Sequence, residues 1–310
     1  MVEQHIAVLL MAYGSPNSLD EVGEYLRQVR GGRPTTSVDA DRLRERYRKV
    51  GGQTPLLKIT LAQASGLQRR LDSEHVHAKV YVGMKHWHPF IEETVEGIVR
   101  EGASGIVGLA LAPHYSKLSI GGYEDAVRRG LESTRLIPFS MVKNWHAQPR
   151  LIEALAGRVR RGVDRMERPS EAGLLFTAHS LPKRFVGDGD PYENQLKETS
   201  RLVAAKAGVG SWDFAFQSAG EPVDSWLGPQ IKEKLDELSR KGLWELLLCP
   251  VGFVSDHLEI LYDLDIEARE QGKSLGMRVS RTDSLNDDPL FIEAIAESVK
   301  PLISTKLAVA

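Results

Sequence analysis

Short apolar runs alternate with longer amphipathic, charge-rich segments along all 310 residues of the chain. This alternation is typical of parallel strands, because each crossover between two parallel strands needs a connection about as long as a helix. The candidate strands lie at 6–14, 78–84, 105–113, 136–142, 173–180, 213–219 and 243–253, with a weaker candidate at 278–281. Helical patterns lie near 18–30, 38–49, 58–73, 89–101, 119–133, 147–162, 191–207, 228–240, 255–270 and 288–304. The pattern therefore predicts an α/β fold.

The two halves of the chain resemble each other. Each half carries four candidate strands, and VLLMAYG in the first half is similar to LLFTAHS in the second. We therefore expect two similar doubly wound domains, residues 1–142 and 143–310, that face each other across a cleft. The pattern leaves open the order of the strands and whether the C-terminal helix crosses back to the first domain.

Composition excludes several classes of protein. A formal net charge of -2 gives no basic field that would attract nucleic acid. The single cysteine, Cys249, excludes a disulfide within the chain and any cysteine-built zinc or iron–sulfur site. No apolar stretch approaches the roughly 18 residues that cross a bilayer, and the N-terminus does not read as a signal peptide. We expect a soluble, cytoplasmic, monomeric protein without stable membrane insertion.

Polar side chains follow the candidate strands at the points where the strands end. They are Tyr13, Lys85, His86, His114, Tyr115, His179, Ser180, Gln217, Ser218, Asp256, His257 and Glu259. In open α/β sheets, ligands bind outside the carboxyl ends of the strands. A histidine at one strand end also fits a plain structural role at the edge of the core, but polar residues at six strand ends favour a binding site.

The segment 254–270, VSDHLEILYDLDIEARE, reads as a helix that Ser255 or Asp256 caps. Its residues Glu259, Asp263 and Glu267 are four apart, so in an α-helix they form one acidic row. Like charges at this spacing are destabilising, which suggests that a cation is bound along the row. The alternatives are a solvated acidic face and, for Glu259 alone, a capping carboxylate.

The familiar motifs of other enzyme classes are missing. The sequence contains no G-x-S-x-G around Ser180, no P-loop and no H-E-x-x-H, and its paired glycines at 31–32 and 51–52 do not follow a strand directly. What remains is imidazole with carboxylate, a donor set that suits Fe(II), Co(II) or Zn(II) better than a hard cation. Arginines are concentrated at 27–48, where most suit solvated helix faces and some could bind a carboxylate ligand bidentately.

Several motifs together resemble one family, the ferrochelatases. They are LLMAYGSP, GGQTPL, LAPHYS, TAHSLP, GDPY, DSWLGP and VGFVSDHLEILYDLD, in this order along essentially the whole chain. The sequence is most similar to the short bacterial coproporphyrin III ferrochelatases. The resemblance implies two Rossmann-like domains with a porphyrin in the cleft between them, and insertion of Fe(II) into coproporphyrin with release of two protons. It implies porphyrin and ferrous iron as substrates, with transient partners from the haem pathway.

The resemblance also assigns roles to residues. His179 and Glu259 become the inner metal pair and the catalytic residues, and Asp263 and Glu267 become an outer metal site. Tyr13 matches the tyrosine beside the porphyrin that can bind iron axially in the product complex. Further residues match positions that hold the tetrapyrrole and its propionates: Arg30, Arg46, Tyr47, Thr54 and Tyr123. Thr54 stands where close relatives carry serine and keeps the hydroxyl.

Iron is a substrate in this reading, and no permanently bound cofactor is expected, since one cysteine cannot hold a [2Fe-2S] cluster. Three alternatives stay open. They are a protoporphyrin IX ferrochelatase, a chelatase that inserts cobalt or nickel into a sirohydrochlorin, and a haem or porphyrin carrier without catalysis. The sequence does not decide which of His179 and Glu259 binds the metal first and which takes the proton.

Overall fold

The computed structural model describes residues 5–187, 189–220 and 225–307. Contacts within the chain divide it into two compact units. The first takes the described residues up to Ala112, the segment Ser119–Trp145 and the described residues from Asn286 onward. The second takes the described residues of Pro113–Leu118 and His146–Leu285.

The first unit is built on a four-stranded parallel sheet in the order β2-β1-β3-β4. The strands are β1 (Ile6–Ala12), β2 (Ala78–Met84), β3 (Gly105–Ala110) and β4 (Phe139–Val142). β1 lies inside the sheet, where Ile6 pairs with Ala78 of β2 and with Gly105 of β3. Every residue of β1 is buried, which explains why this strand reads as a continuous apolar run.

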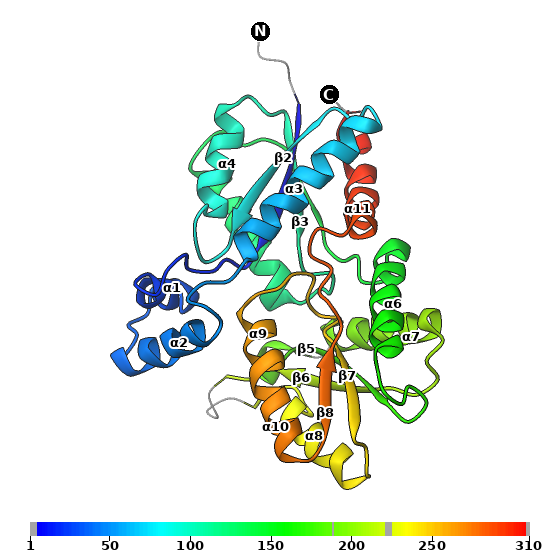
Figure 1. The fold of residues 1–310 in the computed structure, drawn as a ribbon. Coiled ribbons are helices and arrows are strands. Elements are labelled where there is room, and N and C mark those ends of the chain that lie inside the picture. The colour runs from blue at the N-terminus through cyan, green and yellow to red at the C-terminus, as the bar shows by residue number, and fades with distance from the viewer. Residues whose placement is uncertain (1–4, 188, 221–224, 308–310) are drawn as a thin grey trace. The chain divides into compact units, whose positions relative to one another are not determined.

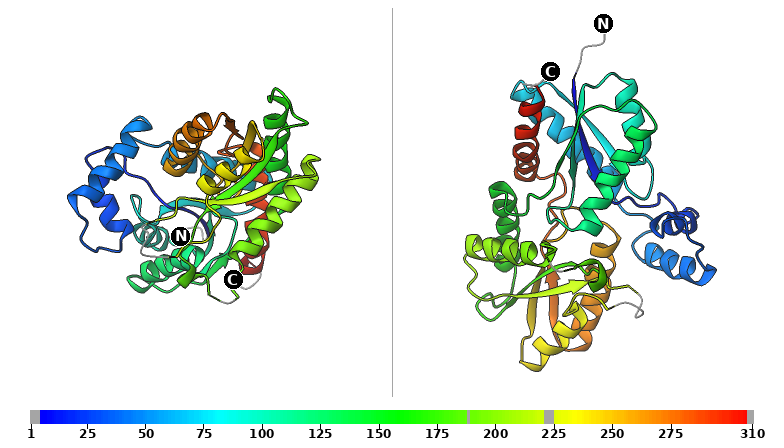
Figure 2. Two further views of the ribbon diagram at one scale, coloured as in Figure 1. Left: turned by 90° about the horizontal axis from the view of Figure 1, so that it is seen from below. Right: turned by 180° about the vertical axis from the view of Figure 1, so that it is seen from behind.

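Helices cover both faces of this sheet (Figure 1). α3 (Leu56–Ser73) and α11 (Pro289–Leu307) lie side by side on one face, and α11 also contacts β1, β3 and β4. α4 (Ile91–Arg100) and α5 (Gly122–Glu132) pack together on the other, α5 following a π-helical turn at Lys117–Gly121. Figure 2 shows the red α11 beside the cyan α3 from behind. The last helix of the chain thus packs in the first unit.

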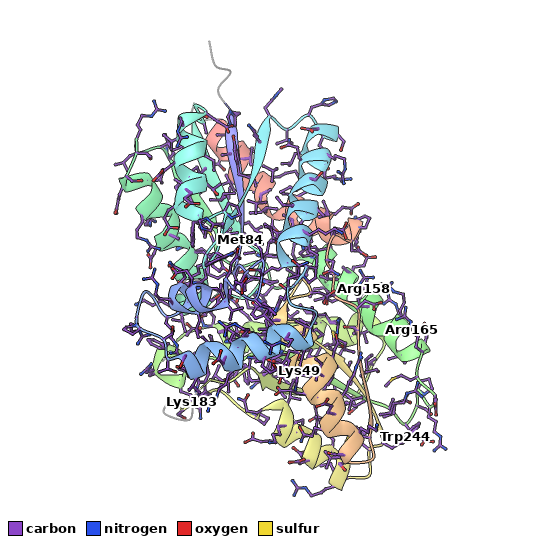
Figure 3. The ribbon with its side chains drawn as sticks, turned by 60° about the vertical axis from the view of Figure 1, so that its left-hand side comes forward. Lys49, Met84, Arg158, Arg165, Lys183 and Trp244 are labelled. Carbon is purple, nitrogen blue, oxygen red and sulfur yellow. The ribbon has the colours of Figure 1, made fainter. Side chains whose placement is uncertain are left out.

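Two further helices, α1 (Val22–Val29) and α2 (Ser37–Lys49), pack against each other, set apart from the sheet of their unit (Figure 1). Aromatic side chains connect α1 to the strand ends. Tyr25 of α1 donates a hydrogen bond to the carbonyl of Gly14, and its ring meets that of Trp87 edge to face. Figure 3 labels Met84, the last residue of β2, and Lys49, the last residue of α2. The α1–α2 pair is therefore fixed at the carboxyl end of this sheet.

The second unit contains another four-stranded parallel sheet, in the order β6-β5-β7-β8. The strands are β5 (Gly173–His179), β6 (Asp213–Gln217), β7 (Glu245–Cys249) and β8 (Arg278–Arg281). Its helices are α6 (Pro149–Asp164), α7 (Tyr192–Ala207), α8 (Ile231–Arg240), α9 (Leu258–Leu261) and α10 (Arg269–Ser274), with a 3₁₀ turn at Lys183–Phe185 and a π-helix at Asp263–Ala268. Figure 3 labels Lys183, just after β5, and Trp244, just before β7, on opposite sides of this unit.

The prediction of parallel sheets flanked by helices is confirmed, and each unit follows the same strand order with the first strand of the unit second in the row. All eight candidate strands are present, but the first ends at Ala12 rather than at residue 14, and the seventh begins at Glu245. Along the residues described, no helix combines the length and the hydropathy needed to cross a membrane.

The core of the second unit positions the candidate metal residues. Ile260, Leu264 and Ala268 are buried against a cluster that includes Leu175 of β5 and Leu248 of β7. Full burial of an isoleucine or leucine side chain stabilises a fold by about 1.5–3 kcal/mol. The acidic residues 259, 263 and 267 each precede one of these buried residues, so packing of the apolar row fixes the acidic row beside it.

Candidate metal and porphyrin site

The first candidate residue, His179, is the last residue of β5, and the chain turns away directly after it. The amide of Ser180 still pairs with the carbonyl of Gln217 at 2.8 Å, and its hydroxyl donates to the carbonyl of Leu227 at 2.8 Å. Pro182 then forms an antiparallel bridge with Trp226. Ser180 is fully buried and serves to shape the turn, so it is no serine nucleophile.

Close packing brings the loop after β7 against this strand end. A Cβ atom at Gly252 would lie 2.6 Å from the Cβ of Ala178, a distance that real side chains do not reach. The amide of Gly252 donates to the carbonyl of Thr177 at 3.2 Å. Only glycine therefore lets the chain pass this close to β5 on its way to α9.

His179 and Glu259 meet directly. The Nδ1 atom of His179 lies 2.9 Å from Oε2 of Glu259, and the two side chains are 34% and 28% exposed. The hydroxyl of Tyr192 donates to the backbone carbonyl of His179 at 3.0 Å, which fixes the strand end. The structure therefore brings together the two residues of the expected inner pair, and it does not support the alternative that Glu259 is a capping carboxylate.

The backbone of Glu259 is held from both sides. Its amide donates to Nδ1 of His257 at 3.2 Å, and its carbonyl accepts from Nε2 of Gln217 at 2.9 Å. Gln217 is buried at the end of β6 and accepts in turn from the hydroxyl of Thr177. The expected cap at Ser255 or Asp256 is wrong: His257 caps α9, because its imidazole accepts from the first turn of the helix.

The two imidazoles titrate in opposite directions. Burial acts to lower the pKa of His179, but the neighbouring carboxylates of Glu259 and Asp263 outweigh it and raise the pKa above its usual value. Burial lowers the pKa of His257. A neutral His257 can accept at Nδ1 from the amide of Glu259, as its geometry requires. The carboxylates near His179 thus favour its protonated form, whereas burial favours the neutral form of His257.

The acidic row continues differently from the expected α-helix. The chain forms a π-helix over Asp263–Ala268, in which the amide of Glu267 bonds to the carbonyl of Tyr262 at 3.0 Å, five residues back. The 100° step of an α-helix therefore does not apply here. Asp263 is 9% exposed, whereas Glu267 is exposed. The row runs from a half-buried carboxylate through a buried one to the surface.

Asp263 has a specific partner at the end of β6. Its Oδ2 atom accepts a short hydrogen bond from the hydroxyl of Ser218. Ser218 has a φ of 59°, a left-handed conformation that costs a non-glycine residue about 1 kcal/mol or more. The fold accepts this cost at a residue whose hydroxyl bonds the second carboxylate of the row. Strained residues of this kind concentrate at functional sites.

Among the described residues, no group of three or more histidine, cysteine, aspartate or glutamate side chains has the arrangement of a metal-binding cluster. The pair of His179 and Glu259 supplies two donors, one nitrogen and one oxygen. Such a pair leaves most coordination positions of an iron or zinc ion open for other ligands.

The first unit gathers its own candidate residues beyond β1 and β2. The ring of Tyr13 is 45% exposed and lies 4.5 Å from the ring of His86, centroid to centroid. Lys85 places its Nζ 5.1 Å from the centre of the Tyr123 ring. Burial and the charge of Lys85 lower the pKa of His86 to about 4, and burial also lowers the pKa of Lys85 itself. Tyr13 therefore lies beside His86 and Tyr123 beside Lys85, two basic side chains whose pKa values are lowered.

Hydroxyl groups form a chain near the start of α3. Thr54 donates to the hydroxyl oxygen of Ser15 at 2.8 Å, and Ser15 lies 3.1 Å from the hydroxyl of Tyr47. Tyr47 is 1% exposed, so it supports Ser15 and Thr54 from within the unit. Ser15 was not singled out from the sequence, although it lies two residues beyond Tyr13 in the same strand exit.

The arginines of α1 and α2 mostly pair with acids of the same two helices. Arg30 donates to Asp39 at 2.8 Å, and Arg27 pairs with Glu24. Arg44 and Arg48 each pair with the acid three residues before them. Arg46 lies on α2 and is half-buried. Arg30 uses one of its five donor hydrogens on Asp39, and a guanidinium can bind a second carboxylate with the others.

Several residues of the site have no role in the sequence prediction. Gln217, Ser218 and His257 were noted only as strand-end polar residues, and Tyr192 only within the GDPY motif. Arg281, the last residue of β8, was not noted among the strand-end residues, because RVSR is short and polar and is only a weak strand candidate. Gln217, Ser218 and Arg281 lie at strand ends, a position that could have identified them. His257 and Tyr192 lie instead at the starts of α9 and α7.

Comparison with known proteins identifies the family. A family model described as Ferrochelatase matches residues 5–302. A ferrochelatase of Herpetosiphon aurantiacus is 43% identical over 293 residues, which cover 93% of this chain and 96% of that protein. A coproporphyrin III ferrochelatase of Geobacillus thermodenitrificans is 38% identical over 304 residues, which cover 96% of each protein. A ferrochelatase of Deinococcus radiodurans is 40% identical over 303 residues.

Solved structures agree in fold. The sirohydrochlorin chelatase of Bacillus subtilis subspecies spizizenii, determined in complex with cobalt, matches with a TM-score of 0.59 at 12% identity, over 97% of this chain and 96% of that one. A structure of the Bacillus subtilis protein with Fe3+ matches with a TM-score of 0.60 at 13% identity. At this identity the likeness concerns the fold. The match of the family model over residues 5–302, together with relatives of 38–43% identity, shows that the chain belongs to the ferrochelatase family.

Proposed function

We propose that the chain inserts Fe(II) into coproporphyrin III, forming Fe-coproporphyrin III (coprohaem) and releasing two protons as a step of haem biosynthesis. Family membership gives the coarser part: the chain is a ferrochelatase, an enzyme of the lyase class that inserts iron into a porphyrin. That the porphyrin is coproporphyrin III is our proposal. Relatives with 35–38% identity are named coproporphyrin III ferrochelatases, whereas others of 40–43% identity are named only ferrochelatases.

The observation that carries the proposal is the pair of His179 and Glu259 at 2.9 Å. A porphyrin must lose its two core N–H protons as the metal enters, so the reaction needs a group that accepts protons beside a group that holds a cation. An imidazole and a carboxylate at one strand end provide both. The charge of an arriving Fe(II) displaces any proton held between the pair to solvent, so that one group can hold the metal and the other can accept a core proton as the metal enters the porphyrin.

Asp263 and Glu267 extend the pair towards the surface. We assign them the outer metal site, from which iron moves inward and along which protons move outward. The gradation of exposure supports this assignment, since Glu267 is exposed and Asp263 is buried next to Ser218. A carboxylate that faces water can exchange hydrated ions, and a buried one holds an ion that has lost part of its water.

Residues of the first unit are assigned to the tetrapyrrole. Tyr13, which is exposed, suits contact with the macrocycle and can donate an axial oxygen to iron in the product. Tyr123 is assigned to the tetrapyrrole as well, although it is 5% exposed and lies beside Lys85. Arg30, Arg46 and Thr54 suit the carboxylates of the substrate, with Tyr47 supporting Thr54 through Ser15. Coproporphyrin carries four propionates and protoporphyrin two, so a site rich in cations and hydroxyls favours coproporphyrin.

We further propose that the enzyme has no permanently bound cofactor, works in the cytoplasm as a monomer, does not bind nucleic acid and inserts into no membrane. Iron enters as a substrate. Its contacts with other proteins of the haem pathway are transient in this proposal.

The test is anaerobic turnover of coproporphyrin III and protoporphyrin IX with Fe(II), followed by the absorbance of the metalloporphyrin. We expect kcat/KM to be higher for coproporphyrin III. A higher kcat/KM for protoporphyrin IX would reassign the substrate within the family. Turnover of sirohydrochlorin with cobalt or nickel in preference to both would favour the other chelatase class, and tight haem binding without any metallation would favour a carrier.

A further inference from the structure

Arg281 is the last residue of β8 and forms a partly buried ionic cluster at the carboxyl end of the second sheet. Its Nε and Nη2 atoms donate to the two oxygens of Asp265 at 3.0 and 2.9 Å, in a bidentate arrangement. Nη2 also lies 3.1 Å from Oδ1 of Asp256. Ser284 donates to the same Oδ1 at 2.7 Å. The side chain of Arg281 is 13% exposed, and those of the two aspartates are 20% exposed.

The two aspartates enclose the candidate metal residues in the sequence. Asp256 precedes α9, and Asp265 lies within the π-helix. Glu259 and Asp263 fall between them, as does the capping residue His257. One guanidinium therefore holds both ends of the stretch that presents the metal carboxylates, and it does so from a different element, the edge strand β8.

Asp256 and Asp265, which bond to Arg281, thus have a different role from Glu259 and Asp263, to which the metal role is given. The charge of Arg281 is committed to Asp256 and Asp265, which raise its pKa despite its burial. Arginine suits this task because its planar fork binds one carboxylate bidentately and can reach a second with the remaining hydrogens. Lysine, with a single nitrogen, cannot reproduce this geometry.

We propose that Arg281 is a positioning residue for iron: by joining Asp256 and Asp265 to β8, it fixes where Glu259 and Asp263 stand relative to His179. This inference deepens the proposed function and rests on the metal roles given to Glu259 and Asp263. Neither the family match nor the resemblance assigns a role to Arg281. It touches neither substrate in this account and acts through the segment that it holds.

The chain offers a matched control for this proposal. Arg269 also pairs with Asp265, at 2.9 Å, but it lies on the same helical segment four residues later and its side chain is 48% exposed. Arg269→Gln therefore removes an equal charge from the same aspartate without releasing the segment from β8. A surface pair of this kind contributes about 0–1 kcal/mol.

The experiment compares the parent, Arg281→Gln, Arg281→Lys and Arg269→Gln. Initial rates are measured against Fe(II) and against porphyrin separately, and porphyrin affinity is measured by fluorescence. We expect Arg281→Gln to lower kcat/KM for Fe(II) by about 10- to 100-fold, the effect of misplacing a reacting group by about 1 Å. Porphyrin affinity should stay within about 2-fold, Arg281→Lys should recover only part of the loss, and Arg269→Gln should match the parent.

A loss of thermal stability in Arg281→Gln with unchanged kinetics for iron below the unfolding range would overturn the proposal. So would equal kinetic effects of Arg281→Gln and Arg269→Gln, or an equal loss of affinity for porphyrin. Hydrogen–deuterium exchange over 257–268 keeps the test independent of catalysis. If the parent shows no metal insertion, the proposed function fails, while faster exchange in Arg281→Gln than in Arg269→Gln still supports the positioning role, and equal exchange contradicts it.

Discussion

Replacement of Glu259 by glutamine isolates the carboxylate charge of the inner pair. The amide and carbonyl of Glu259 make the bonds to His257 and Gln217, and both are backbone atoms that the substitution leaves in place. The side chain keeps its volume and its reach to His179. Any loss of function in Glu259→Gln therefore reports on the charge and its bond to Nδ1 of His179.

The expected effect on stability is small. Two unit charges about 4 Å apart at the protein surface attract each other by about 4 kcal/mol before solvation is counted. Both side chains remain about a third exposed, at 34% and 28%, so solvent screening reduces the net contribution to about 1 kcal/mol. This corresponds to a decrease in Tm of about 2 to 4 °C.

The expected effect on catalysis is much larger. Loss of a positioned acid–base or metal-binding group lowers rates by about 100- to 10,000-fold, which equals about 3 to 5 kcal/mol of activation free energy. The assay is anaerobic iron insertion at saturating porphyrin, with thermal unfolding run alongside. Glu270→Gln, which removes an exposed carboxylate from α10, serves as the control. A Glu259→Gln rate within about 10-fold of the parent, or a decrease in Tm several times larger than expected, would refute the reasoning.

The pair also predicts how stability depends on pH. The folded-state pKa of His179 lies above its unfolded value, so the folded state binds the proton more tightly. The stabilisation is fully present below the unfolded pKa of about 6.5 and is lost as pH rises through the higher folded pKa. The difference in unfolding free energy between the parent and Glu259→Gln should therefore shrink from acid to alkaline pH. A difference that grows with pH would show that the sign of the shift is wrong.

Three further predictions follow from the geometry. Arg46→Ala should raise KM for coproporphyrin III much more than it lowers kcat, as expected for uniform binding; a loss in kcat alone would contradict this role. The double variant Asp263→Asn with Glu267→Gln should lose activity most at low Fe(II), as measured by initial rates against Fe(II) concentration. Identical rate curves for the variant and the parent would indicate that the two carboxylates form only a solvated face. Asp263→Ala should destabilise the fold by about 1 kcal/mol, because Asp263 is buried and its carboxylate bonds to Ser218. Chemical denaturation measures this, and an unchanged free energy of unfolding would show that the bond contributes nothing.

The sequence predicts the strands well because buried parallel strands must be apolar throughout. β1, β3 and β7 are buried along their whole length, and in the sequence they appear as apolar runs, of which the run in β7 starts after Glu245. The order of the strands is not visible in such runs, since any of them could occupy the centre of a sheet. The halves resemble each other near 6–14 and 173–180, and the two sheets share one strand order, which agrees with two similar units.

The sequence predicts the parts of the candidate site that depend on side-chain chemistry. It does not predict the parts that depend on the hydrogen bonding of the backbone. Their positions at a strand end and a helix start marked His179 and Glu259 as candidates, and the resemblance of TAHSLP and DHLEILYD to ferrochelatase motifs paired them. The π-helix at Asp263–Ala268 could not be predicted, because it differs from an α-helix by a one-residue shift of hydrogen bonds that no residue type specifies. The cap of α9 was assigned to the wrong residue for a related reason: Asp256 is engaged by Arg281, which lies 25 positions later in the chain.

The central claim is that His179, together with Glu259, carries out metal insertion while other residues bind the porphyrin. The most direct measurement is the rate of metalloporphyrin formation by His179→Ala under anaerobic conditions, beside its affinity for free porphyrin. We expect that insertion is abolished and that porphyrin affinity stays close to that of the parent. Near-normal insertion by His179→Ala would contradict the account, and so would a loss of porphyrin binding as large as the loss of rate.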